Sequence, residues 1–209
     1  PLPIHITPTA QKMIETIASN VTDDLRPIFL ALLNHQTADE ALSQMGDLKR
    51  LFNSPLRNTA TPTILRGGNK INVIPAEITV DMDGRILPGM TPEIFLGQLR
   101  AVVGDDVELQ VTNFEHGPNT HDMGLYDLLA EELRYADETA IAMPYLLSGV
   151  TDARFFAQLG IQTYGYLPMK LPIGFSFATT IHAADERIPV EAVGFGTDII
   201  YRVLGRYAG

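Results

Sequence analysis

The spacing of apolar residues predicts that the chain opens with helices. Between Thr7 and Val21, apolar residues recur at the intervals that place them on one face of a helix. Thr7 followed by Pro8 is a typical helix start, because the Thr side chain caps the first N–H groups and Pro fits the first turn. Residues 22–35 and 38–51 are expected to form further short helices.

Beyond these helices the pattern changes to that of an antiparallel sheet. Residues 61–65 resemble a strand, and a second strand is expected from Ile71. The Gly67-Gly68 pair between them marks a turn, so this stretch predicts a hairpin. Residues 76–86 alternate between apolar and polar side chains, as in an antiparallel strand that buries one face.

A helix from Thr91 to Val103 and a strand over 107–114 are expected next. The order strand, strand, helix, strand matches the later part of a ferredoxin-like β-α-β-β-α-β module. We expect the first strand and helix of that module to precede residue 1.

The remainder of the chain is expected to form an α/β layer. The loop at 116–121 is a plausible boundary. The elements expected after it are helices at 122–136, 151–159 and 190–207 and a strand at 161–166. The predicted fold class is therefore α/β, with an α+β part followed by an α/β layer.

Composition narrows the function. The chain has 25 acidic and 15 basic residues, a net charge of −10. This argues against nucleic acid and anionic membranes as partners, because phosphate binding needs clustered Lys and Arg. Cysteine is absent, so any metal would be held by His, Asp and Glu. No apolar run is long enough to span a bilayer, and because the first residue is not Met we expect the chain to begin inside a longer protein.

His182 is the first candidate for chemistry. It lies in the segment Ile181-His-Ala-Ala-Asp-Glu-Arg-Ile-Pro, just before the last predicted helix, where site residues of α/β folds are often found. Asp185 and Glu186 could orient its imidazole around a metal. Alternatively, the two carboxylates only favour the N-terminus of the following helix through its dipole.

A second candidate group lies at the start of the helix predicted at 151–159. Backbone N–H groups there could bind a carboxylate beside Thr151, and Arg154 could grip it with two hydrogen bonds. Alternatively, Thr151 is only a helix cap. Arg154 could equally be an ion-pair partner of Asp185 or Glu186.

Asn72 and Arg85 form the third candidate group. Asn72 lies in the apolar segment Ile71-Asn-Val-Ile-Pro, where a polar side chain needs a partner. The alternative interpretation is that Asn72 closes the hairpin turn and that Arg85 pairs with Asp83 or Asp81.

The remaining histidines are weaker candidates. His5 and His35 have no acidic residue at metal-binding spacing. A second metal site around His116 and His121 is an alternative, but this stretch has the composition of a solvated loop.

Taken in order, three segments resemble the C-terminal half of a known enzyme family. They are Gly67–Pro75 with Arg85, Ser148–Phe155 and Ile181–Pro189. The family is that of the aminoacylases, carboxypeptidase G and succinyl-diaminopimelate desuccinylase, which are dizinc metallopeptidases and amidohydrolases. The resemblance implies amide hydrolysis of small peptides or N-acyl amino acids by a metal-activated water.

The resemblance also implies a domain organisation. Residues 1–116 would form an incomplete ferredoxin-like lid and dimerisation domain, without its first strand and helix. Residues 117–209 would form the C-terminal portion of the zinc-peptidase catalytic domain. A cytoplasmic homodimer, joined through the lid, is expected.

Particular residues match the motifs of the family. His182 fits an H-x-x-D/N-E segment that holds one of two zinc ions, with cobalt or manganese as alternatives, and Asp185 and Glu186 would support it. The residues that would contact the substrate are Asn72, Arg85, Thr151 and Arg154.

Important motifs of the family are not found in this sequence. There is no H-x-D pair, and Glu131-Glu132 lies on a helix after the lid rather than before it. No catalytic residue is therefore assigned, and the general base is expected upstream of residue 1. We expect the chain alone to be inactive and to bind zinc weakly or not at all. The alternative is a non-catalytic interaction or dimerisation module that associates through an open sheet edge.

Overall fold

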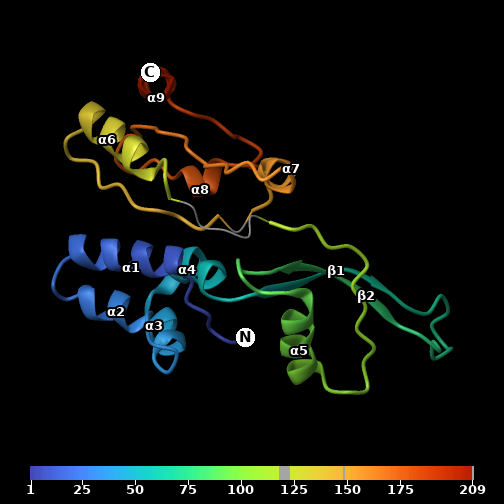
Figure 1. Cartoon of the computed structure of the whole chain (residues 1–209). Coiled ribbons are helices and arrows are strands. Elements are labelled where there is room, and N and C mark those ends of the chain that lie inside the picture. Colours follow the sequence, from blue (N-terminus) through green and yellow to red (C-terminus); the bar gives the residue numbers. More distant parts are fainter. Residues whose placement is uncertain (118–122, 148, 209) are drawn as a thin grey trace. The chain divides into compact units, whose positions relative to one another are not determined.

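The structure, a computed structural model, describes most of the chain (Figure 1). The described residues are 1–117, 123–147 and 149–208. Contacts divide the chain into two compact units, Pro1–His121 with Pro144–Gln162, and Asp122–Met143 with Thr163–Gly209. The boundary loop predicted at 116–121 falls largely outside the described residues, so the domain division stays a prediction.

The first unit opens with short helices, as the sequence predicts. In chain order they are α1 (Pro8–Asn20), α2 (Arg26–Ala31), α3 (Ala38–Gln44), the 3-10 helix η1 (Gly46–Leu48) and α4 (Lys49–Leu56). The Oγ1 of Thr7 caps α1 by accepting a hydrogen bond from the N–H of Ala10 at 3.2 Å. The apolar faces meet in one core, whose largest fully buried side chains are Met13, Ile14, Leu32, Leu42 and Leu56.

A buried arginine ties the start of the chain to these helices. Arg57 is only 3% exposed. Its Nη1 donates to the carbonyl of Leu2 at 2.9 Å, and its Nη2 pairs with the carboxylate of Asp39 on α3. Ile4 forms an antiparallel bridge with Arg57. The guanidinium charge is thus compensated where it is removed from water.

The hairpin follows directly. Strand β1 (Thr59–Arg66) pairs antiparallel with β2 (Thr79–Arg85), and a bulge lies between Pro62 and Ile64. The helix α5 (Pro92–Val103) begins at the predicted place, capped by the hydroxyl of Thr91. The contact of Gly84 with the ring of Phe95 brings α5 against the hairpin, because a Cβ at Gly84 would lie 2.7 Å from Cε1 of that ring.

Three of the predicted strands are wrong. Residues 71–73 form a turn, and the partner of β1 begins only at Thr79. At 107–114 and at 161–166, where strands were predicted, there is no strand. A strand needs a neighbour for its N–H and C=O groups, and among the described residues β1 and β2 pair only with each other. Side-chain alternation does not supply that neighbour.

The helix α7 (Ala153–Gln158), predicted at 151–159, belongs to the first unit, and the second unit is held by two long helices. These are α6 (Tyr126–Ala136) and α9 (Val190–Tyr207), with the short α8 (Phe177–Thr180) between them in the sequence. Leu129 of α6 packs against Ile199 and Val203 of α9. None of the described helices is both long and apolar enough to cross a membrane.

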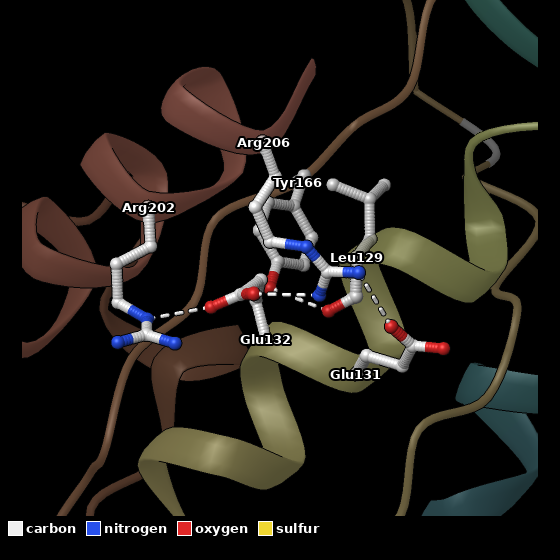
Figure 2. A network of polar contacts seen from close by, with 6 residues as sticks. All are labelled: Leu129, Glu131, Glu132, Tyr166, Arg202 and Arg206. Carbon is white, nitrogen blue, oxygen red and sulfur yellow. Dashed lines mark hydrogen bonds and ion pairs between the residues drawn. The ribbon is translucent and has the colours of Figure 1, made fainter. Parts of the chain in front are cut away.

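A buried glutamate joins α6 to α9 (Figure 2). Glu132 is 2% exposed. Its Oε2 accepts from Nε of Arg202 at 2.6 Å, and its Oε1 accepts from Nη1 of Arg206 at 2.8 Å. The hydroxyl of Tyr166 donates to the carbonyl of Leu129 beside this pair, at 2.9 Å. The hydrogen bond from Arg206 and, after it, the one from Arg202 hold the pKa of Glu132 below its ordinary value.

We expect Gly84→Ala to destabilise the hairpin. The added Cβ would collide with the buried ring of Phe95, so the free energy of unfolding should fall by about 1–3 kcal/mol in chemical denaturation. Gly97→Ala on α5 is the matched control, since nothing lies within 4 Å of its Cβ position. A helical Ala should there raise stability by roughly 0.5–1 kcal/mol. Equal effects of the two substitutions would contradict the packing described for Gly84.

We expect Glu132→Gln to lower the free energy of unfolding by about 1–3 kcal/mol at neutral pH, because two charge-assisted hydrogen bonds lose their acceptor charge. The neighbouring Glu131→Gln is the control, since Glu131 is exposed and pairs with Arg206 at 2.9 Å on the surface.

The effect should depend on pH with a definite sign. The pKa of Glu132 is lowered in the folded state. Its contribution is therefore complete above the ordinary carboxyl pKa and is lost as the pH falls through the lowered value. The free energies of unfolding of the wild-type protein and of Glu132→Gln should therefore converge at acidic pH. A stability difference between them that widens on acidification would refute the assignment.

Candidate functional site

His182 lies in the turn that leads toward α9. It is exposed, and its φ of 58° makes it a non-glycine residue with left-handed backbone. Such a conformation is uncommon outside glycine and costs free energy, and it is found more often at functional sites than elsewhere. The loop position predicted for His182 is present, while its role as a metal ligand stays a prediction.

The two acidic residues after His182 do not form one cluster with it. Asp185 pairs with the side chain of Arg187, and Glu186 is exposed with its backbone N–H bonded to the carbonyl of Ala183 at 3.2 Å. Their predicted role behind the metal ligand stays a prediction.

The described residues do not complete a metal site. They contain no group of three or more metal-ligating side chains, whereas a catalytic zinc usually has three protein ligands. His116 stacks edge-on against Phe114, with ring centroids 4.6 Å apart. His121, the other half of the alternative second site, lies outside the described residues. The described residues around His182 therefore do not supply the three ligands that a catalytic zinc needs.

Thr151 and Arg154 lie at the start of α7. The Oγ1 of Thr151 accepts from the N–H of Ala153 at 3.3 Å, but the N-cap of α7 is Asp152, so the alternative role of Thr151 as the helix cap is wrong. The guanidinium of Arg154 forms an ion pair with Glu115 and lies over the ring of Phe155, 4.6 Å from its centroid. Its buried Nε has no hydrogen-bond partner among the residues that the structure describes. Arg154 thus binds a carboxylate of the chain itself, and its predicted contact with substrate stays a prediction.

The partner of Arg154 was missed by the sequence reasoning. The expected alternative partners were Asp185 or Glu186, whereas the structure pairs Arg154 with Glu115. Glu115 precedes Arg154 by a long stretch of chain, and spacing along the sequence gives no signal for such a pair.

Asn72 and Arg85 lie in different parts of the hairpin. Asn72 is exposed in the turn between the strands, as the alternative interpretation predicted. Arg85 is the last residue of β2, and its Nε donates to Oδ2 of Asp83 at 2.7 Å, so the predicted ion pair is also present. Because β2 rises by about 3.3 Å per residue, the hairpin does not bring Asn72 and Arg85 together.

Comparison with known proteins supports one family. Residues 11–110 match the peptidase dimerisation domain of the M20 family. The chain is 29% identical to N-fatty-acyl-amino acid synthase/hydrolase PM20D1 of Homo sapiens over 185 residues, which is 85% of this chain and 36% of the relative. No solved structure matches the chain.

Two further relatives have other names. The chain is 25% identical to the probable carboxypeptidase S-like 2 of Dictyostelium discoideum over 167 residues, 78% of this chain and 32% of the relative. It is 28% identical to aminoacylase-1 of Pongo abelii over 148 residues, 68% of this chain and 35% of the relative. The chain therefore spans about a third of the length of the curated relatives it matches.

The matched domain contains the first of the three sequence segments, Gly67–Pro75 with Arg85. The domain match covers most of α1 and continues through the hairpin and α5. The relatives extend the similarity over most of the remaining chain. The resemblance predicted from the sequence is thereby confirmed: residues 11–110 match the peptidase dimerisation domain of the M20 family, and the chain is similar to members of that family over most of its length.

Proposed function

We propose that this chain is part of a metal-dependent hydrolase that cleaves the amide bond of N-acyl amino acids or small peptides. The observation that carries the proposal is the similarity over 185 residues to an N-fatty-acyl-amino acid synthase/hydrolase. The aminoacylase and the probable carboxypeptidase among the relatives agree with this reaction class. Residues 1–116 would act as the lid and dimerisation domain, and residues 117–209 would contribute to the catalytic domain.

His182 is proposed to hold one of two zinc ions through its imidazole. Enzymes of the family typically use zinc, which lowers the pKa of a bound water. The exposed loop and the left-handed backbone of His182 support the assignment. Asp185 and Glu186 would orient the ring by accepting a hydrogen bond from its other nitrogen. The other ligands and the general base would come from protein outside these 209 residues.

The substrate would be held by side chains of the first unit. Arg85 and Arg154 are suited to a substrate carboxylate, because each already pairs with a carboxylate, of Asp83 and Glu115. Substrate would compete with these internal partners. Asn72 would donate its amide to the developing oxyanion. Thr151 would set the N-terminal turn of α7 toward the bound substrate.

A homodimer joined through the hairpin is proposed as the assembly. The outer edges of β1 and β2 have no partner strand among the described residues. Leu65, Ile78 and Val80 are exposed on the same hairpin, at 73%, 63% and 42%. An open edge with exposed apolar side chains favours pairing with a second chain, as the domain's family description indicates.

The open edge also favours the second candidate function, a non-catalytic interaction module. It differs from the enzyme in one testable respect, because it needs no metal. Metal content of the full-length protein therefore separates the two functions.

The 209-residue chain alone should bind zinc weakly. With a single candidate ligand among the described residues, calorimetric titration should give no affinity in the submicromolar range. His182→Ala should leave the titration nearly unchanged. Tight binding that His182→Ala removes would show that ligands from the undescribed residues complete a site.

In the full-length protein, His182→Ala and Arg85→Ala should have different effects. Loss of His182 should remove one metal and reduce turnover of N-acyl amino acids at least about 100-fold, since a dizinc site works as a unit. Arg85→Ala should retain both metals and lower kcat/KM by roughly 10- to 100-fold, the range expected for a lost charge-assisted hydrogen bond.

Elemental analysis and steady-state kinetics on a panel of N-acyl amino acids and dipeptides would measure both effects. The substitution Arg66→Ala is the control, because Arg66 pairs with Asp81 toward the hairpin turn and is given no substrate contact. Full metal content and normal kcat in His182→Ala would end the ligand assignment. An unchanged kcat/KM in Arg85→Ala would leave Arg85 as the ion-pair partner of Asp83 alone.

A further inference from the structure

We propose that Asn58 is a positioning residue for Arg85. The inference rests on the proposed function, which gives Arg85 a contact with substrate. It adds the residue that fixes the backbone from which the Arg85 side chain extends.

Asn58 is a buried side chain with defined partners. It is 1% exposed and stands immediately before β1. Its Oδ1 accepts from the N–H of Leu87 at 2.7 Å, and its Nδ2 donates to Oε1 of Gln98 at 2.8 Å. The same Nδ2 lies 3.0 Å from Sδ of Met90. A buried amide with both ends bonded resists rotation, because leaving either end unpaired costs free energy.

The bond to Leu87 holds the chain just after Arg85. In the ladder, Arg85 pairs with Thr59, and this is the pair nearest the open end of the hairpin. Leu87 lies two residues further, beyond the reach of the strand pairing, and its side chain is 5% exposed. The side chain of Asn58 thus continues the ladder where backbone hydrogen bonds stop.

The contact of Gly84 holds the chain just before Arg85. A Cβ at Gly84 would lie within 2.7 Å of the ring of Phe95, so the strand lies close against α5. Phe95 and Gln98 both belong to α5. Arg85 therefore lies between two backbone positions, Gly84 and Leu87, and the contacts of both lead to the same helix, α5. A small rotation of the backbone would move its guanidinium far, because that group ends a long side chain.

A merely structural Asn58 would also be buried and bonded. Both interpretations predict lower stability for Asn58→Ala, so stability cannot separate them. They differ in coupling. If Asn58 acts through Arg85, its substitution has nothing left to disturb once Arg85 is absent.

The experiment is a double-mutant cycle in the full-length protein, using the N-acyl amino acid of the panel that is turned over fastest. Asn58→Ala should lower kcat/KM by roughly 10- to 100-fold, the size expected when a binding group is misplaced by about 1 Å. In the Arg85→Ala background, the same substitution should change kcat/KM by less than about twofold. Gln98→Met, a milder change at the other end of the amide, should act in the same direction with a smaller loss.

Two further measurements keep the outcomes distinct. Hydrogen exchange at the N–H of Leu87 should become faster in Asn58→Ala, which tests the bond itself without substrate. Thr7→Ala is the control, since Thr7 is buried in the same unit but caps α1 and takes no part in the β1–β2 ladder. It should lower the melting temperature and leave kcat/KM unchanged.

The results that overturn the proposal are specific. If Asn58→Ala lowers kcat/KM by the same factor in the Arg85→Ala background as in the wild-type protein, Asn58 is only structural. If Arg85→Ala alone is normal, the proposed substrate contact fails and the positioning role fails with it. If Gln98→Met and Asn58→Ala both keep normal kcat/KM while Arg85→Ala does not, Arg85 acts but does not need Asn58. Unchanged exchange at Leu87 would show that the bond does not hold that backbone.

Discussion

The adjacent buried residues Arg57 and Asn58 are the constraint on which the first unit depends. The guanidinium of Arg57 donates to the carbonyl of Leu2, ahead of α1, and pairs with Asp39 on α3. The side-chain amide of Asn58 accepts from the N–H of Leu87 and donates to Gln98 on α5. The large apolar cluster of this unit lies within residues 4–56, so the hairpin is joined to the helices by buried polar groups. Directional bonds of this kind fix a geometry that apolar contact alone leaves loose.

The second unit uses the same principle with charge. Glu132 is buried between α6 and α9 and is bonded by Arg202 and Arg206 (Figure 2). Leu129 and Ile199 provide the apolar contact, whereas the carboxylate defines which turns of the two helices face each other. A buried carboxylate would be costly without these partners, so the two helices can approach in few registers.

Internal carboxylates also shape the proposed site. Both arginines that are proposed to bind substrate already form an ion pair with a carboxylate of the chain. Arg85 pairs with Asp83, and Arg154 pairs with Glu115. These ion pairs are partly exposed, so they stabilise the fold little and can be exchanged for a substrate carboxylate at small cost. They keep the guanidinium groups oriented in the absence of substrate, which reduces the ordering that binding requires.

The sequence by itself determined most of the longer helices and the resemblance to the family. Caps and apolar spacing located α1, α5 and α9, because these signals act within a few residues of one another. The three motif segments identified the family because they fix residue types at fixed spacing. Tertiary structure alone decided the strand that partners β1, the pairing of Arg154 with Glu115 and the bonds of Asn58. Each of these joins residues far apart in the chain, and neither hydrophobic alternation nor local spacing specifies which distant group will satisfy a hydrogen bond.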